Sequence, residues 1–187
     1  MMEVVFVLSA LGFAGSLLVH LVALLGLADV PLGLAWAAFF PSMALAVVLN
    51  TRVILQRYYD YTDLPPGEFW RFITRNAPDW MRSLQFALVL YAVLNFYVTM
   101  LVVNRGGYPR LVDGAYVLER HKVVIETLTR QEYLWHASFV VRMLSSIVMA
   151  VFFAAVMRWI ARWRTVASSQ PRAAEETAGQ PDAPPAR

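Results

Sequence analysis

The stretch VVFVLSALGFAGSLLVHLVALLGLA at residues 4–28 contains no Asp, Glu, Lys or Arg. Residues 30–51 and 83–104 are also uncharged, and residues 134–157 are interrupted only by Arg142. Each run exceeds the ~20 residues that an α-helix needs to cross ~30 Å of hydrocarbon. Because lipid offers the backbone no hydrogen-bond partners, a spanning segment must be helical. The sequence therefore predicts an all-α membrane protein, a four-transmembrane-helix bundle. Its spans are expected at about residues 4–27, 31–51, 82–103 and 134–158.

The composition agrees with a membrane class. The chain has 187 residues, of which 59% are hydrophobic and 16% charged, and its mean hydropathy is +0.52. Soluble domains lie nearer ~45–50% and ~25%. The net charge is +3, and the basic residues flank the apolar runs, which favours lipid headgroups over nucleic acid as the partner. The absence of Cys excludes disulfides, thiolate metal sites and Cys nucleophiles.

The N-terminal run has the properties of a retained helix. It is preceded by Glu3 and by no basic residue, and it is longer than the apolar core of a signal peptide. We therefore expect one transmembrane domain over residues 1–164. Residues 165–187 are rich in Ala, Pro, Gln, Glu and Ser, which predicts a disordered tail.

Two links between the spans are long enough to have structure of their own. After Pro65-Pro66-Gly67, residues 66–76 combine apolar and Arg positions, which predicts a short interfacial helix. The extramembrane loop at residues 104–133 contains two β-prone runs, at residues 116–118 and 123–125, which predict a small β-hairpin. Thr129 and Glu132 form a capping-box pattern at the start of the last helix.

The positions of the basic residues orient the bundle. Four spans place both termini and the link at 52–82 on one side, with eight Arg residues near the membrane. The other side has five basic residues, all in the long loop or next to it. The excess favours cytoplasmic termini in a multi-pass membrane protein.

The polar residues inside the spans define a candidate cluster. At a rise of ~1.5 Å per residue, His20 and Arg142 lie about 10 Å from the loop-side boundary, and Asn95 lies slightly deeper. Residues spaced by three or four positions place these side chains on faces that can meet beneath the loop. The candidate cluster comprises His20, Tyr91, Asn95, Arg142 and Ser146.

Each member has a structural and a functional reading. His20 and Asn95 suit interhelical hydrogen bonds, and a metal or haem at His20 is the less favoured alternative. Arg142 either extends to the headgroups or forms an ion pair, or it contacts an anion, a lipid or a substrate. Its candidate ion-pair partners are Asp29, Asp113, Glu119 and Glu132, of which Asp29 and Glu132 are preferred, because no carboxylate lies within a span. No metal site and no cofactor are predicted.

Several segments resemble a known family. They are Ala77-Pro78-Asp79-Trp80 with residues 91–96, His20 with residues 21–26, and Gly107-Tyr108-Pro109 with residues 113–118, Glu132-Tyr133 and Arg142. Together they resemble a family of uncharacterised bacterial four-span membrane proteins over most of residues 10–150. Members of that family often have Gly after the loop His, where this chain has Lys122. The resemblance implies the topology and a bacterial membrane, and it implies no activity.

Three functional hypotheses follow. The first is a non-enzymatic accessory or scaffold protein that binds a lipid or a membrane protein partner through the 104–133 loop and the candidate cluster. The second is a small transporter or channel that acts as a homo-oligomer, because four helices leave little room for a pore. The third is a membrane enzyme or redox protein, although the sequence contains no nucleotide, metalloprotease or nucleophile-elbow motif.

Overall fold

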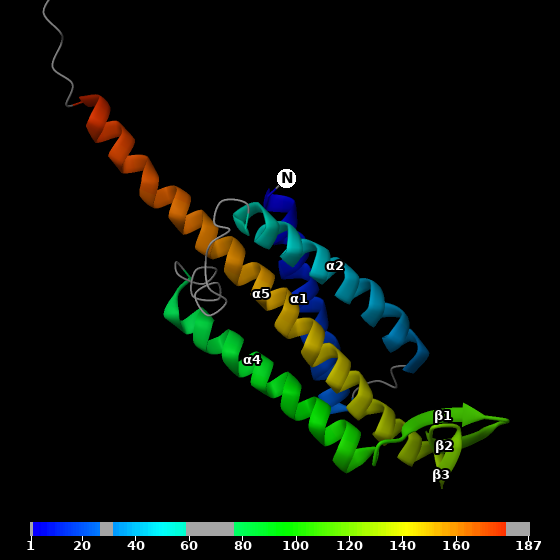
Figure 1. Cartoon of the computed structure of the whole chain (residues 1–187). Helices are drawn as coiled ribbons and strands as arrows, with labels where there is room; N and C mark the ends of the chain where they lie inside the picture. The colour runs from blue at the N-terminus through cyan, green and yellow to red at the C-terminus, as the bar shows by residue number, and fades with distance from the viewer. Residues whose placement is uncertain (1, 27–31, 59–76, 179–187) are drawn as a thin grey trace, which may run out of the picture.

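The computed structural model describes the backbone of residues 2–26, 32–58 and 77–178, and the side chains of residues 3–26, 32–51 and 77–164. Four described helices are long and apolar enough to cross a membrane: Glu3–Leu25, Leu32–Thr51, Asp79–Val103 and Arg130–Arg164. The helices are α1 (Met2–Leu25), α2 (Leu32–Tyr58), α4 (Asp79–Tyr97), the π-helix η1 (Val98–Val103) and α5 (Arg130–Ala178) (Figure 1). The predicted set of four apolar helices is thereby confirmed.

The third and fourth helices begin before the apolar runs that predicted them. Helix α4 starts at Asp79, directly after Pro78, and α5 starts at Arg130, directly after Thr129. Thr129 Oγ1 accepts a hydrogen bond from Glu132 N at 3.2 Å, and Glu132 Oε2 accepts one from Thr129 N at 2.7 Å. This reciprocal pair is the predicted capping box. A capping box therefore sets the start of α5, and Pro78 precedes the first turn of α4, where no side chain caps the helix. Hydrophobicity marks only the apolar part of each helix.

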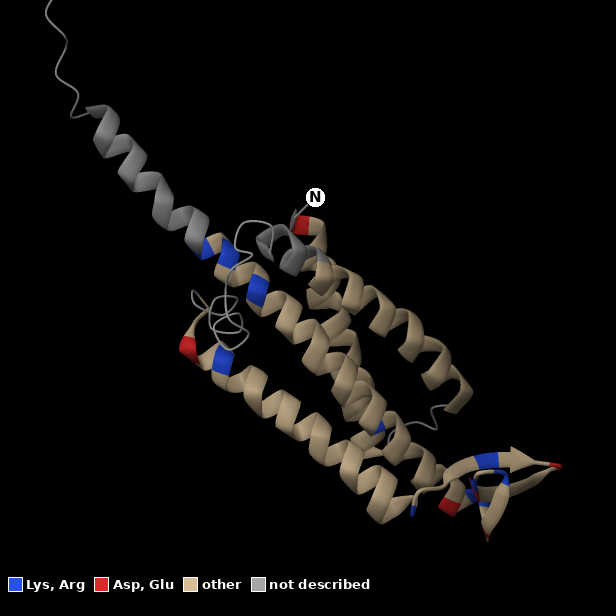
Figure 2. Cartoon of the chain, in the orientation of Figure 1, with Lys and Arg blue, Asp and Glu red and all other residues tan. Residues whose placement is uncertain are grey.

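Helix α5 is the centre of the bundle. In its most apolar window 72% of the residues are buried, compared with 17–22% in the other three helices. It packs against α1, α2 and α4, and it lies between α2 and α4 in Figure 1. The outer helices direct large apolar side chains outward, including Leu11, Leu34 and Phe86 at 64%, 62% and 70% exposure. The charged residues of the described chain gather mainly at the two ends of the bundle (Figure 2).

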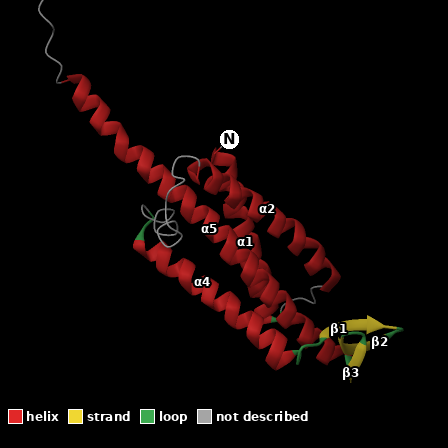
Figure 3. Ribbon diagram, viewed as in Figure 1, coloured by secondary structure: helices red, strands yellow, loops and turns green. Residues whose placement is uncertain are grey.

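A small antiparallel sheet lies at the end of the bundle where η1 stops and α5 begins (Figure 3). Its strands, in the order β1-β2-β3, are β1 (Tyr108–Val112), β2 (Ala115–Arg120) and β3 (Val123–Leu128). Strands β2 and β3 form the predicted hairpin. Strand β1 was not predicted, because Pro109 disfavours a strand. A proline is nevertheless compatible with an edge strand, and β1 lies at the edge of the sheet.

Both turns of the sheet require left-handed backbone. Asp113 and Gly114 have φ of 49° and 81°, and His121 and Lys122 have φ of 51° and 67°. Two successive positive φ angles are typical of the type I′ turn that joins antiparallel strands through two residues. The first turn has the favoured Asp-Gly pair, whereas the second places Lys122 where Gly is preferred.

Some predictions fall beyond the described residues. The interfacial helix at residues 66–76 and the short connection that contains Asp29 lie outside them. Helix α5 continues to Ala178, into the stretch for which the sequence predicts a disordered tail. The side chains from residue 165 onward lie outside the description, so the disordered tail stays a prediction.

Candidate functional site

A buried hydrogen-bond network connects α1, α4 and α5 at His20. His20 Nε2 lies 2.6 Å from the Tyr91 hydroxyl, and His20 Nδ1 lies 3.0 Å from Ser145 Oγ. Ser145 Oγ in turn donates to Val141 O at 2.8 Å. Because that hydroxyl proton is engaged, Ser145 Oγ accepts from His20 Nδ1, and in a neutral ring Nε2 then accepts from the Tyr91 hydroxyl. Both nitrogens of the imidazole are thus bonded.

This geometry agrees with the interpretation of His20 as a residue that forms hydrogen bonds between helices. A metal at either ring nitrogen would displace a hydrogen bond. The chain of donors ends on a backbone carbonyl, which cannot pass a proton onward. Within the described residues, no group of three or more His, Asp or Glu is placed to hold a metal ion.

The serine that bonds His20 is Ser145, whereas the cluster predicted from the sequence contained its neighbour Ser146. Ser146 is fully buried, but its hydroxyl donates to Met143 O of its own helix at 2.8 Å. The two serines are adjacent, about 100° apart around the helix, so the sequence pattern left open which of them faces α1. The cluster as described therefore contains Ser145 in place of Ser146.

The contacts between α4 and α5 establish an antiparallel register, which we call the α4–α5 seam. Thr99 Oγ1 donates to Phe139 O at 3.2 Å, and Gln85 Nε2 donates to Ala150 O at 3.3 Å. The His20 ring bonds both Tyr91 of α4 and Ser145 of α5, which places these two residues at about the same level. Residue numbers fall along one helix as they rise along the other. Asn95, between Thr99 and Tyr91 in α4, is therefore opposite Arg142, between Phe139 and Ser145 in α5.

Asn95 and Arg142 differ from the His20 network, because each has a buried donor without a partner. Asn95 is 8% exposed, and its Nδ2 has no hydrogen-bond partner in the described part of the chain. Arg142 Nε is buried and unpartnered in the same sense. Both atoms are donors only, so this level of the seam offers hydrogen bonds that no described protein atom accepts.

The Arg142 side chain extends toward the sheet. Its Cζ lies 4.6 Å from the Phe139 ring centroid, and that ring lies 5.0 Å from the Trp135 ring. Helical side chains lean toward the helix N-terminus, which for α5 is the sheet end. Among the described carboxylates none pairs with Arg142, and Glu132 instead bonds Thr129. Asp29, the other preferred partner, lies outside the described residues.

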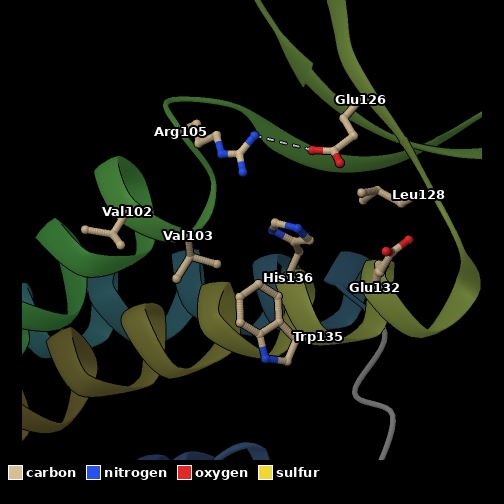
Figure 4. Close-up of a pocket in the computed structure, with 8 residues that line it drawn as sticks. All are labelled: Val102, Val103, Arg105, Glu126, Leu128, Glu132, Trp135 and His136. Atoms are coloured by element: carbon tan, nitrogen blue, oxygen red, sulfur yellow. Dashed lines mark ion pairs between the residues drawn. The ribbon is translucent and has the colours of Figure 1, made fainter.

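A cleft of about 280 Å³ opens at the sheet end of the seam, between η1, β3 and the first turns of α5 (Figure 4). We call it the loop-side cleft. Its apolar wall consists of Val102, Val103, Leu128 and Trp135. Its polar wall consists of Arg105, Glu126, Glu132 and His136. Sequence reasoning did not predict this cleft, because it depends on how the sheet folds back over α5.

The side chains of the polar wall have defined partners. Arg105 Nη1 lies 3.7 Å from Glu126 Oε2, and the two side chains are 69% and 49% exposed, so this ion pair adds little stability. His136 Nδ1 lies 2.8 Å from Asn104 Oδ1. An amide oxygen only accepts, so Nδ1 carries the proton and Nε2 of the neutral ring remains an acceptor. In Figure 4 the His136 ring stands between Arg105 and Trp135.

The π-helix η1 positions Asn104 for this contact. Asn104 N donates to Thr99 O at 2.9 Å, five residues earlier, as π-helical turns do. Asn104 is fully buried beneath the cleft, and its Nδ2 has no described partner. The chain then passes Gly107, where a Cβ atom would lie 2.8 Å from Ile125 Cδ1 and 3.0 Å from Asn104 O. Glycine at this position lets the sheet fold closely over η1.

A second polar contact lies toward the opposite end of the bundle. Arg158 is 6% exposed and donates to Asn50 Oδ1, and Asn50 Nδ2 donates to Ala46 O at 2.7 Å. This contact ties α2 to α5. From the sequence, Arg158 was interpreted only as a flanking charge, because the hydropathy pattern does not show that it faces Asn50.

Comparison with known proteins assigns no relative: no family model, no curated protein and no solved structure matches the chain. The resemblance noted above therefore stays a prediction. The fold and the site define only a class. It is a mostly helical protein with four apolar helices long enough to cross a membrane and a three-stranded sheet at one end.

Proposed function

We propose that this chain is a four-span protein of the bacterial cytoplasmic membrane that acts as a non-enzymatic accessory or scaffold protein. It binds a lipid or a protein partner at its loop-side end. The observation that carries this proposal is the loop-side cleft. There, charged groups meet the apolar wall at the level where the outward apolar surface of α4 and η1 ends.

The outward faces of the helices support the membrane part of the proposal. Contiguous apolar surface of this extent is not stable in water and calls for acyl chains. Both termini in the cytoplasm follow from the Arg distribution. The chain contains no Cys, so each single introduced Cys is a unique label. In intact cells, an impermeant maleimide should label Gly114→Cys and leave Arg164→Cys unlabelled; the reverse pattern would invert the orientation.

The polar groups inside the bundle support a non-enzymatic role. The hydrogen bonds of His20, Tyr91, Thr99 and Gln85 run between helices, and they hold α1 and α4 against α5. Polar contacts of this kind serve helix association in lipid. A transporter would need a path past α5, which is the most buried helix.

Lipid is the ligand that the cleft favours. Trp135 is 52% exposed at its edge, and Val102 is 66% exposed on η1. Tryptophan is enriched at the level of lipid headgroups. An amphipathic ligand would place its polar part against Arg105, Glu126 and Glu132 and its apolar part along η1.

Filling the cleft tests this proposal. Val102→Trp adds bulk at its wall, and Leu101→Trp places the same side chain at the adjacent position, which is 54% exposed and does not line the cleft. We expect the first variant to lose lipid that co-purifies from mild detergent, and the second to retain it, as read by native mass spectrometry. Equal retention in both would refute the cleft as the binding site. Ion flux in liposomes that disappears in Arg142→Ala would favour the transporter hypothesis.

A protein partner is the second candidate, and the sheet surface favours it. Leu111, Val123 and Val124 are 58%, 66% and 51% exposed. Pro109 in β1 and the register shift between β2 and β3 hinder strand addition at the edges, so a partner would contact side chains. Val123→Asp should then lose a partner that wild type retains in pull-down from mild detergent. Recovery of the wild-type chain alone would count against this candidate.

A further inference from the structure

The α4–α5 seam contains an arrangement that the proposed function leaves unused. Asn95 and Arg142 occupy the same level of the antiparallel register, between the Thr99–Phe139 contact and the Tyr91–His20–Ser145 network, and the Arg142 guanidinium extends from that level toward the Phe139 ring. Each contributes a buried nitrogen without a described acceptor. Two unpartnered donors at one level, one of them on a cation, form a site complementary to an anion.

We propose that Asn95 and Arg142 form a binding site for a phosphate-type oxyanion in the α4–α5 seam. The inference rests on the proposed function, because it assigns the polar group that a bound amphiphile would present. Asn95 Nδ2 donates one hydrogen bond to the oxyanion, and the Arg142 guanidinium donates the others and balances the charge. The oxyanion is carried by a lipid headgroup or is free phosphate.

The surrounding charges favour an anion at this site. A guanidinium in apolar surroundings requires a counter-charge. Of the described carboxylates at this end of the bundle, Glu119 pairs with Arg110, Glu126 pairs with Arg105 and Glu132 bonds Thr129, while Asp113 lies in the turn between β1 and β2. His20 on α1 bonds Tyr91 and Ser145, and an imidazole offers no negative charge. An external oxyanion supplies the missing acceptor and the missing charge together.

The seam also connects the site to the loop-side cleft. Along α5, the rings of Phe139 and Trp135 lead from Arg142 to the cleft wall. Along the other side, Thr99 and then Val102 follow Asn95. An amphiphile with its phosphate near Arg142 would therefore have the remainder of its headgroup in the cleft.

The test uses the full-length protein in a neutral maltoside detergent that contains no phosphate. Three probes are titrated: inorganic phosphate, a short-chain phosphatidylglycerol, and the uncharged diacylglycerol of the same chain length. Binding is read from the rise in Tm and from phosphorus NMR line broadening. The variants are Arg142→Gln, Arg142→Lys and Asn95→Leu, and the control is Arg164→Gln, an exposed Arg at the far end of α5.

We expect a rise in Tm with a phosphate-bearing probe and none with diacylglycerol. Arg142→Gln should weaken binding at least tenfold, as expected for the loss of charged hydrogen bonds. Asn95→Leu should weaken it several-fold and fold at least as well as wild type, so loss of folding cannot explain its effect. Arg142→Lys distinguishes two roles of Arg142, which are to bind an oxyanion and to extend its charge to the membrane interface. Lys keeps the charge but lacks Nε and the planar guanidinium. This variant should bind several-fold more weakly at unchanged Tm.

The outcomes separate the sources and the two proposals. A response to phosphatidylglycerol alone identifies a lipid headgroup, and an equal response to inorganic phosphate identifies the free anion. No response to either probe, an equal response to diacylglycerol, or wild-type binding in Arg142→Gln would overturn the oxyanion site. If Val102→Trp abolishes lipid retention while Arg142→Gln leaves it unchanged, the loop-side cleft stands and the oxyanion site fails.

Discussion

Two faces of α5 are covered in different ways. On one face lies the α1–α5 seam, formed by the small or polar stripe Ser9, Gly12, Ser16, His20 and Ala23 of α1. At Gly12 the Phe152 ring comes so close that a Cβ atom would lie 2.5 Å from its Cζ. On another face, the α4–α5 seam is lined by larger polar side chains. Gln85, Asn95 and Asn104 each have one buried amide atom without a partner in the described chain.

This difference suggests that the α1–α5 seam mainly holds the helices together, whereas the α4–α5 seam is suited to binding a ligand. Small residues let α1 approach α5 until their surfaces interlock, and the stripe keeps one unpartnered side-chain atom, Ser9 Oγ. In the α4–α5 seam, Gln85 and Thr99 each donate a hydrogen bond to a backbone carbonyl of α5, and the seam ends in the loop-side cleft. We therefore expect substitutions in the first seam to reduce stability, and substitutions in the second to change ligand binding.

The largest effect is expected in the α1–α5 seam. Gly12→Leu would drive its side chain into the Phe152 ring and should lower the free energy of unfolding by about 3 kcal/mol. Gly15→Leu is the matched control, because no atom lies within 4 Å of a Cβ at Gly15. Denaturation in mixed micelles measures both. Equal losses in the two variants would show that the α1–α5 seam does not depend on close packing at Gly12.

The next largest effect is expected at His20, which connects the two seams. His20→Ala removes both hydrogen bonds of the ring and leaves Tyr91 and Ser145 without it, which should cost about 2 kcal/mol. Tyr91→Phe removes one of these bonds and should cost about 1 kcal/mol. Tyr97→Phe is the control, since Tyr97 is 60% exposed. A Tyr91→Phe variant as stable as the control would mean that the network contributes nothing to cohesion.

Much of the fold could be predicted from the sequence, because long uncharged runs are a strong signal for apolar helices. Uncharged runs of sufficient length predicted the four apolar helices, and Thr129 with Glu132 predicted the start of α5. The central position of α5 was not predicted. All four runs are similarly apolar, at mean hydropathies of 2.0 to 2.3, so hydropathy does not reveal which helix the others surround.

The candidate site was predictable in part for a related reason. Helical spacing and depth selected His20, Tyr91, Asn95 and Arg142, and the structure joins the first two by a hydrogen bond. The cluster as a whole stays a prediction. The choice between Ser145 and Ser146 depends on helix rotation, which spacing leaves uncertain by one residue. Asn104 reaches His136 through a π-helical turn, and no periodicity argument anticipates that turn.

A smaller effect, of opposite sign, is expected in the sheet that covers the α4–α5 seam. Lys122 has φ of 67°, where a side chain is strained, so Lys122→Gly should stabilise the β2–β3 hairpin by about 0.5–1 kcal/mol. Because β3 contributes Glu126 and Leu128 to the cleft, slower amide exchange in β3 should accompany the gain. Asp113→Gly is the control with a smaller gain, since Asp tolerates this conformation. Faster exchange in Lys122→Gly would contradict the strain argument.

The smallest effect is expected at Tyr108, which packs beside Trp36 with ring centroids 5.8 Å apart. Burial raises the pKa of the Tyr108 phenol, with a smaller contribution from Tyr133. The folded protein therefore keeps the proton, while the unfolded chain releases it near pH ~10. The resulting contribution to stability is complete below about pH 10 and is lost as the pH rises above that value. Denaturation midpoints from about pH 8 to about pH 11 should fall less steeply for Tyr108→Phe than for wild type. Identical slopes would show that this phenol is as accessible to water in the folded protein as in the unfolded chain, and that the sheet does not seal its end of the bundle.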